Sequence, residues 1–146
     1  GNTMKVNQIS VFLDNRKGRL FEVCSLLGKN NINIRALNVA EAEDFGVLRM
    51  VVDEPAAALK LLKDNHFVAN LTEIVAVEVE DRPGGLAEIL RVIQVNELNV
   101  EYMYGFVEKK TGKALMVFRF DKPDRAIQIL LDGGVKVVTE ADVRKL

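Results

Sequence analysis

The chain has 146 residues, of which 49% are apolar and 28% are charged, and its formal net charge at pH 7 is −1. This composition predicts a packed globular protein, and the balanced charge removes the electrostatic reason to expect nucleic acid or an anionic membrane as a partner. No apolar run approaches the roughly 20 residues that would span a bilayer.

The N-terminus and the cysteine content favour a cytoplasmic location. The first residues, GNTMKVNQ, lack the apolar segment of a signal peptide. The single Cys24 cannot form an internal disulfide, so a reducing compartment is the simplest home for it. One cysteine and one histidine, His66, cannot make a zinc site, and no cofactor motif is present. We therefore expect neither a metal nor a cofactor.

In chain order, the first half predicts strand, helix, two strands, helix and strand. Apolar and polar residues alternate over residues 8–13, which is typical of a strand with one apolar face. Residues 20, 23, 24 and 27 then form an apolar helical stripe, which would bury Cys24. Strands are expected at residues 32–40 and 47–52 with a turn at Glu43-Asp44, a helix beginning near Pro55, and a strand near residues 67–71.

The second half repeats this order. Residues 79–100 match residues 13–34 without a gap, at an offset of 66 residues. Six positions are identical: Arg16/Arg82, Gly18/Gly84, Leu20/Leu86, Glu22/Glu88, Asn30/Asn96 and Asn33/Asn99. Residues 121–132 match residues 53–64 at an offset of 68. A turn is expected at residues 109–112, and Thr139 is a candidate N-cap for a last helical turn.

This duplication predicts an α+β protein of two tandem ferredoxin-like units, at residues 5–72 and 73–146. Each β-α-β-β-α-β unit would form a four-stranded antiparallel sheet with both helices on one face. Units of this size are marginal alone, so we expect them side by side in one extended eight-stranded antiparallel sheet.

The loop between the first strand and the first helix is the strongest candidate for binding. In the second copy it reads Asp81-Arg82-Pro83-Gly84-Gly85-Leu86, and in the first Asn15-Arg16-Lys17-Gly18-Arg19-Leu20. A glycine there allows a sharp turn and the close approach of a ligand. The first amides of the following helix lack intrahelical partners and attract a carboxylate or phosphate. Many strand-to-helix turns need a glycine, so the motif alone is weak.

Asn33 and Asn99 begin the strand after that helix. An asparagine there can cap a turn by bonding to its own backbone. Alternatively, its amide supplies one donor and one acceptor, which suits the ammonium and carboxylate groups of a free amino acid. Both interpretations stay open on the residues alone.

Taken together, the Asp-Arg-Pro-Gly-Gly-Leu loop and the asparagine after the helix resemble the ACT domain, in tandem copies over residues 5–139. Members of this family sense small molecules, most often amino acids, where two ACT units meet. The resemblance implicates these ligand-binding residues: Asn15, Arg16, Lys17, Gly18, Arg19, Leu20 and Asn33 in the first copy, and Asp81, Arg82, Pro83, Gly84, Gly85, Leu86 and Asn99 in the second. The family prefers proline where Lys17 stands and often asparagine where Asp81 stands, so the two sites differ.

The resemblance implies a regulatory protein that binds a free amino acid. Family units are commonly attached to a catalytic or DNA-binding domain, and because the sequence shows none we expect a stand-alone, non-catalytic protein. Amides near Gly84-Gly85 or Gly18-Arg19 would hold the ligand carboxylate, and the output would pass to an enzyme or regulator in trans. A homodimer is expected.

Two other functions compete with this one. A ligand-free oligomerisation module would need no site. An RNA-binding module shares the strand order and would present Phe118 and Phe120 for base stacking, although the net charge argues against it. We predict packing roles for both phenylalanines.

Overall fold

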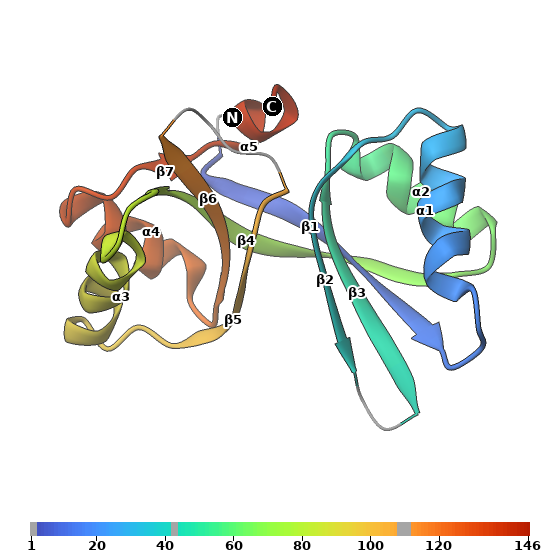
Figure 1. Ribbon diagram of the computed structural model, residues 1–146, viewed down its shortest axis with the longest axis horizontal. Coiled ribbons are helices and arrows are strands. Elements are labelled where there is room, and N and C mark those ends of the chain that lie inside the picture. Colours follow the sequence, from blue (N-terminus) through green and yellow to red (C-terminus); the bar gives the residue numbers. More distant parts are fainter. Residues whose placement is uncertain (1–2, 42–43, 108–111) are drawn as a thin grey trace. The chain divides into compact units, whose positions relative to one another are not determined.

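The computed structural model describes residues 3–41, 44–107 and 112–146 (Figure 1). The expected turns at Glu43 and at residues 109–111 lie outside the described residues. The chain divides into two compact units. One comprises residues 7–72, and the other comprises residues 73–146 together with the N-terminal residues up to Val6.

The unit at residues 7–72 has the predicted order of elements. They are β1 (Lys5–Asp14), α1 (Arg19–Lys29), β2 (Ile34–Glu41), β3 (Phe45–Val52), α2 (Pro55–Asp64) and the first part of β4 (Val68–Glu80). The strand order is β2-β3-β1-β4. Strands β1 and β3 are antiparallel, with Ile9 opposite Met50 and Asp14 opposite Phe45.

The other unit repeats this topology. Its elements are the second part of β4, α3 (Gly85–Val95), β5 (Val100–Gly105), β6 (Lys113–Phe120), α4 (Pro123–Asp132), β7 (Val137–Val138) and α5 (Glu140–Arg144). The strand order is β7-β4-β6-β5, the same order as in the first unit once equivalent strands are matched. The fold is therefore α+β, with a ferredoxin-like β-α-β-β-α-β order in both copies.

Each unit has its own apolar core between its strands and its helices. In the first unit, alternate residues of β1 and β3 pack against Val23 and Leu27 of α1 and Leu62 of α2. In the second unit, Ile89 and Ile93 of α3 pack against β4, β6 and α4. Both helices of a unit lie on the same face of its strands, as Figure 1 shows. The predicted arrangement of helices within each unit is confirmed.

The strand count differs from the prediction. The described residues form seven strands, because β4 runs without interruption from Val68 to Glu80. The sequence pattern predicts two strands there, the last of one copy and the first of the next, joined at residues 70–73. This segment contains no glycine or proline to break a strand. The expectation of eight separate strands is therefore wrong.

Candidate functional site

The first-copy loop ends at a glycine in the left-handed conformation. Gly18 is the N-cap of α1, with φ 84° and ψ −1°. Residues other than glycine rarely adopt this geometry, so the sharp entry into α1 depends on Gly18. Glu22 N–H donates to the Gly18 carbonyl at 2.9 Å, and the amides before it begin the helix without an intrahelical acceptor.

This loop borders a cavity of about 370 Å³. Five of the six predicted loop residues line it: Asn15, Arg16, Gly18, Arg19 and Leu20. The opposite wall comes from the end of β2 and the start of β3, with Val39, Glu41, Phe45 and Gly46. Strand register explains this wall, because Phe45 lies opposite Asp14 and Gly46 lies opposite Leu13.

Asp14 forms ion pairs with both arginines of the first-copy loop. Arg16 Nε donates to both carboxylate oxygens of Asp14 at 3.1 Å, and Arg19 Nε lies 3.4 Å from Oδ1. The hydrogen bond from Arg16 holds the pKa of the Asp14 carboxyl below its usual value and raises the pKa of Arg16. The loop thus carries an ionised carboxylate beside the start of α1.

The second-copy loop ends in the same left-handed glycine turn but has its own backbone hydrogen bond. Gly84 is the N-cap of α3, with φ 84° and ψ −9°. The Gly85 amide donates to the Arg82 carbonyl at 3.0 Å, so the loop itself occupies that donor. In the described part of the chain, the backbone amides of Leu86 and Ala87 have no backbone acceptor. They are therefore the N–H groups at the start of α3 that could donate to a ligand. Of the amides near Gly84-Gly85, the Gly85 amide is therefore engaged within the loop.

A cavity of about 370 Å³ also borders the second-copy loop. It is lined by Asp81, Arg82, Pro83 and Leu86 of the predicted set, with Val79, Glu80, Ala114 and Met116. Gly85 is buried, and a Cβ atom there would lie 2.0 Å from the Glu80 carbonyl oxygen. Gly85 therefore serves the close packing of α3 on β4.

Equivalent arginines of the two loops bind different carboxylates. Arg16 folds back on Asp14, whereas Arg82 Nη2 reaches Glu88 Oε1 at 3.1 Å and Oε2 at 3.2 Å. Glu80, the counterpart of Asp14, pairs with Lys113 instead, and this hydrogen bond lowers the pKa of the Glu80 carboxyl. The two loops therefore carry different charge networks.

Asn33 and Asn99 lie far from the loop of their own unit. Asn33 precedes β2, and Val52 at the far end of β3 lies opposite Ile34. The cavity in this unit lies at the other end of β2, where Val39 and Glu41 line it, roughly 20 Å or more along the strand from Asn33. The backbone N–H of Asn33 donates to Asp53 Oδ1 at 2.9 Å. Asn99 occupies the equivalent place before β5, where its carbonyl accepts from Asp121 N–H at 3.5 Å.

The residues that close the two cavities opposite the loops were missed by sequence reasoning. Phe45 and Gly46 in one copy, and Ala114 and Met116 in the other, belong to strands distant in sequence from the loops. Only the register of β1 with β3 and of β4 with β6 brings them there.

The remaining sequence candidates have structural roles. Phe118 and Phe120 are at most 1% exposed and stack on each other with ring centroids 5.7 Å apart. They cannot stack on bases, which removes the feature that favoured RNA binding. Cys24 is partly buried, and burial raises the pKa of its thiol.

Within residues 3–41, 44–107 and 112–146, no three His, Cys, Asp or Glu side chains form a group that could hold a metal ion. No helix in the described part of the chain is long and apolar enough to cross a membrane.

Comparison with known proteins identifies the family. Residues 4–146 match the family described as ACT domain pair, and the chain belongs to it. Among curated proteins no match was found. The crystal structure of protein BT0572 from Bacteroides thetaiotaomicron is 40% identical, with a TM-score of 0.91 and 98% of each chain covered.

More distant structures share the fold. The ligand-free regulatory subunit of aspartate kinase from Thermus thermophilus is 15% identical, with a TM-score of 0.62, 91% of this chain covered and 97% of that one. The corresponding subunit from Thermus flavus is 13% identical, with a TM-score of 0.59, 92% of this chain covered and 95% of that one.

Proposed function

We propose that this protein is a non-catalytic regulatory protein that binds a free amino acid at its strand-to-helix loops. The observation that carries the proposal is that both copies of the loop bring the uncapped start of a helix to a cavity of about 370 Å³. That volume lies within the range of small-molecule sites. Membership of the ACT domain pair family supports the same class of ligand.

In the proposed mechanism, the ligand carboxylate binds the first amides of the helix. These are the amides of Leu86 and Ala87 in the second copy, where the Gly85 amide is already engaged. The helix dipole favours a negative charge at this place. Asp81 would bind the ligand ammonium group there, and Asn15 would do so in the first copy.

Asn33 and Asn99 enter the proposal as contributions from a second ACT unit. Each lies at the opposite end of the sheet from the loop of its own unit. A ligand that contacts both a loop and such an asparagine therefore needs two units, and a homodimer supplies additional ones. The ligand would act on an enzyme or regulator in trans by shifting the assembly between two conformations. It can do so only if it binds one conformation more tightly than the other.

Isothermal titration with single-site variants tests the site. Once an amino acid ligand is found, Gly84→Val and Asn99→Ala should each weaken binding at the second-copy site at least tenfold. Gly18→Val and Asn33→Ala should do the same at the first-copy site. Gln94→Ala, near the other end of α3, serves as the control and should leave affinity unchanged.

The outcomes separate the proposal from its rival. Full affinity in all four site variants would overturn the assignment of the loops. A protein that binds no amino acid but forms a stable dimer would instead be the ligand-free oligomerisation module.

A further inference from the structure

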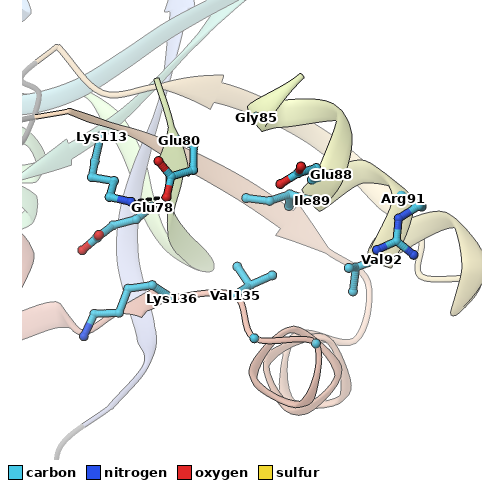
Figure 2. A pocket seen from close by; sticks show the side chains of 12 residues that line it. Glu78, Glu80, Gly85, Glu88, Ile89, Arg91, Val92, Lys113, Val135 and Lys136 are labelled. Carbon is cyan, nitrogen blue, oxygen red and sulfur yellow. Dashed lines mark hydrogen bonds and ion pairs between the residues drawn. The ribbon is translucent and has the colours of Figure 1, made fainter. Parts of the chain in front are cut away.

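A separate cavity of about 450 Å³ lies beside the end of β4 and the start of α3 in the second-copy unit. Its walls come from β4, α3, the segment that follows α4, and Lys113 at the start of β6. Figure 2 shows Ile89 and Val135 projecting toward the same space, with Glu80 and Glu88 on nearby elements. This cavity is distinct from the loop cavity, although Glu80 borders both.

In the first-copy unit an arginine side chain occupies the equivalent place. The Arg19 guanidinium carbon lies 4.4 Å from the centre of the Phe67 ring. Arg19 Nη1 donates to Glu22 Oε2 at 2.8 Å, and its Nε lies 3.4 Å from Asp14 Oδ1. The Arg19 side chain is only 16% exposed. A guanidinium is therefore held there by two carboxylates and an aromatic face.

The second copy keeps the two carboxylates and lacks the arginine. Glu80 and Glu88 are the counterparts of Asp14 and Glu22, whereas Gly85 stands where the first copy has Arg19. Equivalent hydrogen bonds support the alignment of Phe67 with Val135, because their amides donate to Leu62 and Leu130 respectively. The cavity thus corresponds to the space that the Arg19 side chain fills in the first copy.

The present partners of these carboxylates can be displaced at low cost. Glu80 pairs with Lys113 and Glu88 pairs with Arg82, and the four side chains are 37–61% exposed. Exposed ion pairs of this kind contribute little to stability. Ile89, Val92 and Val135 supply an apolar lining suited to an aliphatic stem.

We propose that this cavity binds a small molecule that carries a guanidinium group on an aliphatic stem. The ligand guanidinium takes the place that the Arg19 side chain takes in the first copy, between Glu80 and Glu88. Lys136 and Arg91 at the same cavity provide positive groups for a ligand that also carries a carboxylate. This site goes beyond the proposed loop sites.

Titration calorimetry with agmatine, L-arginine and L-citrulline tests the proposal. Agmatine carries the guanidinium but no carboxylate, so the loop amides have nothing to bind in it. Citrulline replaces the guanidinium of arginine with a neutral urea. Agmatine and arginine should bind, and citrulline should bind at least tenfold more weakly than arginine.

Variants locate the binding. Glu80→Gln and Glu88→Gln should each weaken agmatine binding at least tenfold. The matched control is Glu22→Gln, which alters the occupied position in the first copy and should leave agmatine affinity unchanged. Asn99→Ala should also leave it unchanged, because Asn99 belongs to the proposed amino acid site.

Three results would overturn the inference. They are the absence of agmatine binding at millimolar concentration, equal binding of arginine and citrulline, and undiminished agmatine binding in Glu88→Gln. Each leaves the loop proposal standing, because that proposal depends on the ligand carboxylate and on the loop and asparagine variants.

Discussion

Position 19 and its counterpart at 85 carry the largest chemical difference between the two copies of the loop. Arg19 sends its side chain back over Phe67, whereas Gly85 packs without a side chain against the Glu80 carbonyl. The residue after the cap glycine thus decides whether the space beside the first strand and the first helix of each copy is filled.

Gly85→Ala should destabilise the protein by about 1–3 kcal/mol, because its Cβ would collide with the Glu80 carbonyl oxygen at 2.0 Å. Gly28→Ala is the matched control, since Gly28 lies within α1 and its Cβ would meet nothing within 4 Å. That substitution should stabilise by about 0.5–1 kcal/mol through helix propensity. Urea unfolding measures both, and equal effects would contradict the packing described for Gly85.

Arg19→Ala should cost about 1–3 kcal/mol, because it removes the contact with Phe67 and two ion pairs from a largely buried side chain. Arg16→Ala removes an arginine that also pairs with Asp14 but is 69% exposed. It should leave stability nearly unchanged, because exposed ion pairs contribute little. Urea unfolding of both variants measures these losses. A larger loss of stability in Arg16→Ala than in Arg19→Ala would refute the structural role given to Arg19.

The glycine positions could be predicted from sequence, and the Arg19 side chain could not. Gly18 and Gly84 stand between an apolar strand and an amphipathic helix, which is enough to predict a turn with positive φ. The packing of Arg19 depends on Phe67, 48 positions further along the chain. Local pattern carries no information about such a contact.

At the scale of elements, periodicity predicted the helices better than it predicted strand ends. The stripe of α1 buries Val23 and Leu27, but Leu20 is 41% exposed because it lies at the first turn beside the loop cavity. In β4, polar Asn70, Thr72 and Glu73 were interpreted as a junction. The chain instead stays extended through these residues as part of one strand from Val68 to Glu80, and strand pairing of this kind cannot be read from local sequence.

The last helix depends on the cap that the sequence analysis identified. Thr139 Oγ1 accepts from the Asp142 amide at 3.1 Å and begins α5, whose Val143 is buried. Thr139→Ala should destabilise by about 1 kcal/mol, and Thr139→Ser should restore most of the loss. Amide hydrogen exchange at residues 142–144 should rise in the alanine variant. Unchanged protection there would contradict the cap.

At the scale of the whole molecule, stability should fall on acidification. Hydrogen bonds from Arg16 and Lys113 lower the folded-state pKa values of Asp14 and Glu80 below their ordinary values of 3.8 and 4.5. The folded state therefore binds fewer protons than the unfolded state at these groups, and their contribution is present above those values. It is lost as pH falls through the lowered pKa values. Urea unfolding between pH 3 and 7 measures this, and stability that rises toward pH 3 would contradict it.

The duplicated architecture as a whole could be predicted because both copies repeat the same order of apolar strands and helices. The candidate sites could be predicted only in part. The loops were identified and lie at cavities, but the cavity walls depend on strand register. The placement of Asn33 and Asn99 at the far end of the sheet from the loop of their own unit follows from the predicted strand-helix-strand order, because the helix carries the chain back along the sheet before the next strand begins.

A thermal-shift screen of the twenty common amino acids tests the central claim most directly. A ligand at a hundredfold excess over its Kd adds about 2.7 kcal/mol of stability, which should raise Tm by roughly 5 °C or more for a protein of this size. We predict such a rise for one or two amino acids, and its loss in Gly84→Val or Gly18→Val. No rise with any of the twenty would contradict an amino acid sensor and would favour a ligand-free oligomerisation module.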